Sequence, residues 1–118
     1  MSYCQCDYET PEFYHVAMVA RARKQHKCYE CSKSINVGES YERVRAKWDG
    51  DLSIVRTCCR CLDLRTYVIA HVPCFCLCHG NVNEDAIETA RHYAHEAPGL
   101  LFGAYRRLVK INNAARLA

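Results

Sequence analysis

The chain has 118 residues and a formal net charge of +3, and half of its residues are hydrophobic while a quarter are charged. That length suits one domain with one modest core, and the composition excludes a disordered tail or a proline-rich chain. Ten cysteines are several times the ordinary usage, so we expect a small fold stabilised by disulfides or by metal.

The first predicted element follows Pro11. Thr10 and Pro11 are typical of a helix start, with threonine as the N-cap and proline at the first helical position. The segment from Phe13 to Val19 also fits an extended strand, so both interpretations stay open. A basic run from Arg21 to Lys27 then leads into Cys28.

Alternating residues predict a β-hairpin in the middle of the chain. Its first strand runs from Tyr41 to Lys47, and Leu52 to Thr57 form the returning strand. Asp49 and Gly50 between them are a strong turn signal. One face of the first strand carries Tyr41, Arg43, Arg45 and Lys47.

Three helices are predicted after the hairpin. The first follows Cys58 and is stopped by Pro73, with one side formed by Leu62, Arg65, Thr66 and Ile69. The second runs from Asn83, its expected N-cap, to about Glu96. The third lies within Leu100 to Leu117 and has an apolar stripe, which core packing explains most simply: Leu101, Tyr105, Leu108 and Ile111.

Metal is favoured over disulfides because the N-terminal segment offers no route to an oxidising compartment. It lacks a basic region followed by a long apolar run, and no stretch reaches the length of a membrane span. We therefore expect a cytoplasmic protein with no membrane partner, whose reduced, clustered cysteines bind metal. A secreted disulfide protein that lacks its signal is the alternative.

Two CxxC pairs bracket the predicted hairpin and point to a zinc site. Structural zinc takes four ligands in a tetrahedron, and each CxxC turn presents two thiolates from one bend. A knuckle, a hairpin and a CxxC that opens a helix follow the treble-clef order, so we expect one closed, structural zinc. A redox CxxC is the alternative, although it is typically a single pair near a βαβ unit. The expected ligands are Cys28, Cys31, Cys58 and Cys61, with Cys59 as a non-ligand.

The remaining cysteines hold enough ligands for a second zinc. Such an ion would join the N-terminal segment to the cysteine-rich loop that follows the first helix. The preferred ligands are Cys4, Cys6, Cys74 and Cys76, with Cys78 and His79 as substitutes. The alternative is that some of these residues are buried thiols without metal.

No motif in the sequence predicts catalysis. The hairpin has no histidine, which argues against the nucleases of the His-metal type that treble clefs also host. Glu88, His92 and His95 fall within reach of one helix face, but a solvated face explains them more simply. Since no GxSxG motif or phosphate-binding loop is present, we expect a protein that is not an enzyme and has no small-molecule substrate.

Two basic features and one helix are candidate binding surfaces. The run before the first CxxC supplies Arg21, Arg23, Lys24 and Lys27. The hairpin face supplies Arg43, Arg45 and Lys47, with Tyr41 at its end for stacking on a base, and Arg60 and Arg65 as extensions. Protection of an exposed strand edge is the alternative explanation of those charges. Tyr105 on the last helix is the candidate anchor for a protein partner.

The segments ARKQHKCYEC, VGESYERV, KWDG and TCCRCLDLR, between about Ala22 and Arg65, resemble a group of small zinc-binding proteins of tailed phages and prophages. The resemblance implies a bacterial host cytoplasm and a phage accessory role. Such a protein would bind a host protein or nucleoprotein complex and inhibit it, with CRISPR–Cas complexes among the targets. The alternative is a nucleic-acid-binding zinc-finger regulator that uses the basic hairpin.

Together these expectations describe one α+β domain that spans residues 1–118. Residues 22–70 form its treble-clef zinc core, and residues 71–118 add the cysteine-rich loop and two C-terminal helices.

Overall fold

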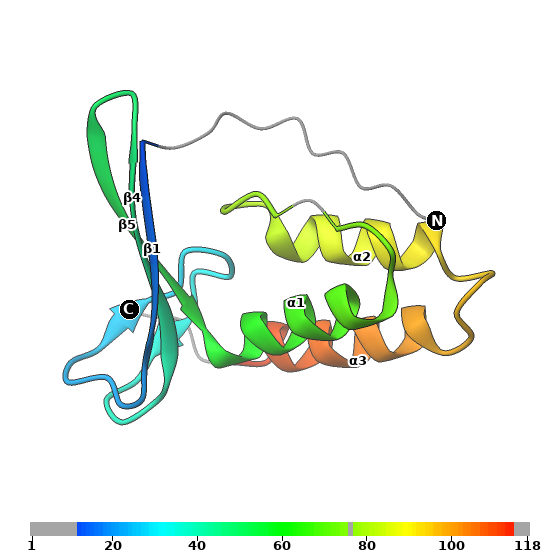
Figure 1. Cartoon of the computed structure of the whole chain (residues 1–118). Helices are drawn as coiled ribbons and strands as arrows, with labels where there is room; N and C mark the ends of the chain where they lie inside the picture. The colour runs from blue at the N-terminus through cyan, green and yellow to red at the C-terminus, as the bar shows by residue number, and fades with distance from the viewer. Residues whose placement is uncertain (1–11, 76, 115–118) are drawn as a thin grey trace.

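The computed structural model describes residues 12–75 and 77–114. Their fold is α+β, with a three-stranded sheet at one end of the molecule and three helices at the other (Figure 1). The expected fold class is confirmed at this level.

The sheet has the order β1-β4-β5, and all of its pairs are antiparallel. Strands β4 (Tyr41–Trp48) and β5 (Asp51–Cys58) form the predicted hairpin. Its turn has φ of 50° at Asp49 and 82° at Gly50. Two successive left-handed residues match the twist of an antiparallel pair, which is why Asp-Gly is favoured there.

Strand β1 (Phe13–Val19) resolves the open interpretation of the N-terminal segment. It pairs with β4 along its whole length, from Phe13 opposite Lys47 to Val19 opposite Tyr41. The helical interpretation is therefore wrong for these residues, because ladder hydrogen bonds to β4 outweigh the local helix signal. Thr10 and Pro11 lie outside the described residues.

Two very short strands flank the first CxxC. β2 (His26–Lys27) and β3 (Ser34–Ile35) pair as an antiparallel ribbon, and the turn between them carries both cysteines. The Cys28 amide donates to the Lys33 carbonyl at 2.9 Å, and the Ser32 amide donates to the Cys28 carbonyl at 3.0 Å. These bonds close the turn that we call the knuckle, residues 28–33.

Helix α1 (Cys59–His71) contacts both α2 (Val82–His92) and α3 (Leu100–Asn112), which also contact each other. Its buried stripe recurs at helical intervals and comprises Cys61, Leu64, Arg65 and Val68. Thr66 and Ile69 are exposed, so the side predicted to carry Leu62, Arg65, Thr66 and Ile69 is not the buried side of this helix. The helix ends at His71, and Val72 is extended, as expected for the residue before Pro73.

The second helix begins and ends earlier than predicted. Asn81 holds the N-cap position and Val82 is the first helical residue, so Asn83 lies within the first turn instead of capping the helix. The helix ends at His92, and His95 therefore does not share a helix face with Glu88 and His92. Turns lead from there to Gly99, whose φ of 85° starts α3.

Candidate metal centre

Four cysteines from three elements meet beside the base of the sheet. Cys28 and Cys31 come from the knuckle, Cys58 is the last residue of β5, and Cys61 lies in the first turn of α1. Their sulfur atoms all lie within 4.8 Å of one another. The Cys28 and Cys61 sulfurs are 3.8 Å apart, as are those of Cys31 and Cys58. These are the four residues that the CxxC spacing predicts.

The sulfur spacing fits a tetrahedral metal ion. A zinc ion with Zn–S bonds of about 2.3 Å requires about 3.8 Å between its sulfur ligands. Three of the four cysteines are buried and Cys31 is half-buried. Four protein ligands leave no open coordination position, which is the arrangement of a structural site. Cys59 is exposed and does not belong to the cluster, as predicted.

Hydrogen bonds already favour negative charge on these sulfurs. The Cys58 amide donates to the Cys28 sulfur at 3.3 Å, and the Asn83 side-chain amide donates to the Cys61 sulfur at 3.3 Å. Contacts from Cys31, Cys58 and Cys61 lower the pKa of Cys28, whereas the same contacts with Cys28 raise the pKa of Cys58 and Cys61. The pKa of Cys31 is lowered as well, mainly by its contacts with Cys58 and Cys61. The cluster alone therefore does not favour negative charge on all four sulfurs, and a divalent cation would compensate that charge.

Glu30 joins the knuckle to α2, and sequence reasoning missed it. Its side chain is only 1% exposed. Its carboxylate accepts hydrogen bonds from the amides of Gly80 at 2.7 Å and Val82 at 3.0 Å, so it caps the N-terminus of α2. Burial raises the pKa of Glu30, although these two amides oppose the shift. A glutamate between two ligand cysteines is the sequence feature that could have indicated this contact.

Replacing Glu30 by alanine is expected to lower the free energy of unfolding by about 1–2 kcal/mol, because it leaves amides at the start of α2 without an acceptor. Urea denaturation followed by circular dichroism measures the change. Glu96→Ala is the matched control, because it removes the same charge from an exposed residue beyond α2. Equal losses in the two variants would show that charge alone, and not the cap, accounts for the effect.

The histidine of the cysteine-rich loop contacts the sheet. The His79 Nε2 atom lies 2.8 Å from the Tyr14 hydroxyl oxygen, and its Nδ1 atom lies 3.9 Å from the Glu30 carboxylate. Burial lowers the pKa of His79. This loop therefore packs between β1 and the knuckle.

The second predicted zinc site stays a prediction. Cys4, Cys6 and Cys76 lie outside the described residues, whereas Cys74 and Cys78 lie in the described part of the loop. Within residues 12–75 and 77–114, the four-cysteine cluster is the one group arranged to hold a metal ion.

The structure separates the predicted cations into surface and interior groups. Arg21, Arg23, Lys24 and Lys27 are exposed, and Arg43, Arg45 and Lys47 share the sheet face that points away from α1. Tyr41 is 4% exposed, with its ring 5.4 Å from the ring of His26, so its predicted role in base stacking is wrong. Its place at the base of the hairpin makes it part of the core.

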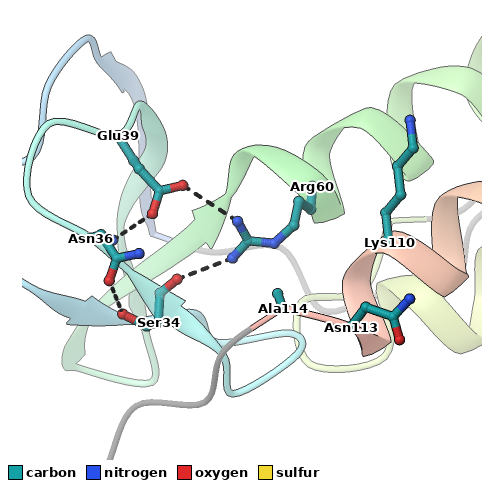
Figure 2. Close-up of a pocket in the computed structure, with 7 residues that line it drawn as sticks. All are labelled: Ser34, Asn36, Glu39, Arg60, Lys110, Asn113 and Ala114. Carbon is teal, nitrogen blue, oxygen red and sulfur yellow. Dashed lines mark hydrogen bonds and ion pairs between the residues drawn. The ribbon is translucent and has the colours of Figure 1, made fainter.

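Two arginines of α1 do not extend the basic hairpin face, contrary to expectation. The buried Arg65 guanidinium makes a two-point contact with the Glu42 carboxylate. Arg60 donates to the Glu39 carboxylate at 3.3 Å and to the Ser34 carbonyl at 3.0 Å, in an open pocket that Lys110 of α3 also lines (Figure 2). Both guanidinium groups are engaged by the protein itself.

Tyr105 lies on the exposed side of α3, and it is 39% exposed. Its hydroxyl accepts a hydrogen bond from Arg91 of α2 at 2.7 Å. Phe102 and Val109 of the same helix are 70% and 54% exposed. These three residues are three and four positions apart, so they form one apolar strip on the surface.

Among residues 12–75 and 77–114, no helix is both long enough and apolar enough to cross a membrane. The chain matches no protein-family model, and comparisons with curated proteins and with solved structures give no significant similarity.

Proposed function

We propose that this protein is a non-catalytic, zinc-stabilised binding module that binds nucleic acid, free or within a nucleoprotein complex. The contact surface is the outer face of the sheet, which carries Arg43, Arg45 and Lys47 of β4 and Arg56 of β5. We call these four residues the basic face.

One observation carries the proposal: Arg43 and Arg56 are directly opposite each other across β4 and β5. Like charges at opposed positions destabilise a sheet. Neither side chain makes an ion pair within the described residues, and the Nε atom of each is buried without a hydrogen-bond partner. A bound phosphate backbone would supply the missing negative charge.

The basic face also meets the basic run that precedes the knuckle. Burial lowers the pKa of His26, and the charges of Arg56 and Lys24 lower it further. Lys24 and Arg56 are therefore close enough to act on the same imidazole. Two basic features that are separate in the sequence combine into one positive surface.

The metal centre lies at the base of the hairpin that carries this surface. Cys58 ends β5 and Cys61 lies in the first turn of α1, so an ion bound there would anchor the base of the hairpin to the knuckle and to the helix. We propose that the ion is zinc and that the knuckle, hairpin and helix form a treble clef. Four thiolates around one divalent ion add net negative charge, so the argument for nucleic acid depends on the local basic face and not on the net charge.

Charge reversal tests the proposal. The double variant Arg43→Glu/Arg56→Glu is expected to abolish binding to a fluorescently labelled 20-nucleotide strand, measured by anisotropy. For the unmodified protein, the logarithm of the binding constant should fall with the logarithm of salt concentration with a slope of about −3, since four cations contact phosphates.

The matched control is Arg106→Glu/Lys110→Glu, which reverses two exposed charges on α3. It should retain most of the affinity of the unmodified protein. Equal weakening in both double variants would contradict a specific basic face and would indicate only a general effect of net charge.

A protein partner is the second candidate function, and the phage resemblance favours a bacterial host protein. The apolar strip formed by Phe102, Tyr105 and Val109 supports it, because exposed aromatic residues are typical anchors of protein interfaces. The strip and the basic face belong to different elements, so one protein could contact both components of a nucleoprotein complex.

A further inference from the structure

The outer face of the sheet carries more than cations. The register places three residues side by side in each row across β1, β4 and β5. The row nearest the hairpin turn is Phe13, Lys47 and Leu52; the next is His15, Arg45 and Ile54; the third is Ala17, Arg43 and Arg56. The first two rows thus hold a cation in the middle, with a ring on one side and an aliphatic group on the other.

These ring and aliphatic side chains are open to solvent. Phe13 is 46% exposed, Leu52 is 57% exposed and Ile54 is 46% exposed, while His15 is also exposed. Apolar side chains on β1 and β5, on either side of the cations of β4, do not help a protein to bind phosphate. They indicate a ligand that presents flat apolar groups together with its negative charges.

We infer that the ligand of this face is single-stranded nucleic acid, an inference that rests on the proposed function. A single strand exposes the faces of its unpaired bases, which stack on Phe and His rings and on guanidinium planes. A duplex hides those faces inside its stack and presents phosphates and sugars outside. Only the single strand therefore uses both the cations and the apolar groups of the first two rows.

The width of the sheet also argues against a duplex. The major groove of B-DNA is about 12 Å wide and admits a ribbon of two strands. Here β1 pairs with β4 along its full length, so three strands lie side by side. Their outer backbones are about 10 Å apart, which leaves too little space for the side chains. Figure 1 shows β1 alongside the hairpin over most of its length.

One carboxylate lies at the rim of this surface. Glu12 is 3.7 Å from the Lys47 amine, and both side chains are substantially exposed. An exposed ion pair of this kind contributes little, so a phosphate could replace the carboxylate as the partner of Lys47.

Anisotropy titrations with a labelled 12-nucleotide DNA strand, the same sequence as RNA, and the corresponding DNA duplex test the inference at one salt concentration. Single-strand titrations repeated at several salt concentrations give the salt slope. We expect both single strands to bind at least about tenfold more tightly than the duplex. Phe13→Ser/Ile54→Ser should weaken single-strand binding about tenfold and leave duplex binding and the salt slope unchanged. Val109→Ser, a similarly exposed apolar residue on α3, is the control and should change neither affinity.

The outcomes separate the inference from the proposed function. Duplex binding that equals or exceeds single-strand binding would overturn the inference and leave nucleic-acid binding intact. Failure of all three nucleic acids to bind would overturn both. A Phe13→Ser/Ile54→Ser variant that binds single strands normally would also overturn the inference. Circular dichroism and metal content establish that each variant is folded.

Discussion

Removal of the proposed zinc ion by a strong chelator is expected to unfold this protein. Structural zinc contributes about 10–16 kcal/mol of binding free energy to small zinc domains, which equals or exceeds the whole stability of an ordinary domain of about 5–15 kcal/mol. Three of the four clustered cysteines lie in the larger buried core, together with Ile35, Leu64 and Leu100, and Cys31 packs against it. The loss of the ion would therefore leave the centre of the core without its strongest restraint. Circular dichroism during chelation should show loss of helical signal, reversed by added zinc.

The pair of cysteines at the start of α1 provides a matched comparison. Cys61→Ser removes a buried ligand and should lose both the metal and the folded state, whereas Cys59→Ser alters the exposed neighbour and should retain both. Elemental analysis of metal per chain and thermal melting measure the two effects. Acidification should mimic chelation, because protons compete with the ion for the thiolates. A stable, metal-free Cys61→Ser variant would refute a structural role for the ion.

Breaking the ion pair between Arg65 and Glu42 is expected to cause the next largest loss of stability. The two residues are 9% and 7% exposed, and the two-point contact joins α1 to β4. Arg65→Met would leave the Glu42 carboxylate buried without its partner, which costs about 3–5 kcal/mol. Urea denaturation of the metal-loaded protein measures the change in the free energy of unfolding.

The double variant Arg65→Met/Glu42→Leu distinguishes the contribution of charge compensation from the contribution of side-chain packing. Replacing both charges by apolar groups of similar size is often neutral or stabilising, so the double variant should regain most of the stability that Arg65→Met loses. A double variant as unstable as the single one would show that the contribution comes from side-chain shape and not from charge compensation.

The hairpin and the ligand cysteines were predictable because their signals are local. Asp49 and Gly50 specify the turn between two alternating segments, and that alternation brings Cys58 to the end of a strand. Two CxxC pairs flanking such a hairpin need no other element to approach each other. The same local spacing explains why Cys59, which is exposed and lies between Cys58 and Cys61, was predictable as a non-ligand.

The errors arose where distant residues override a local pattern. Arg65 is buried because Glu42 of β4 compensates its charge, whereas Thr66 and Ile69 on the same predicted side of the helix are exposed. Asn83 resembles an N-cap, but the cap of α2 comes from Glu30, about fifty residues earlier. No spacing rule within a single segment indicates such contacts.

The contact between Glu30 and α2 has a consequence for the order in which the newly made chain assembles. All four ligand cysteines and the complete hairpin lie within the first 61 residues, whereas α2 and α3 come later. Chains emerge from the ribosome from the N-terminus at about 5–20 residues per second, so the metal centre can close before α2 has emerged. When residues 80–82 emerge, the carboxylate of Glu30 is already held by a folded knuckle. The first amides of α2 would then meet a hydrogen-bond acceptor that is already in place. The direction of translation would thus make the metal centre fold before α2.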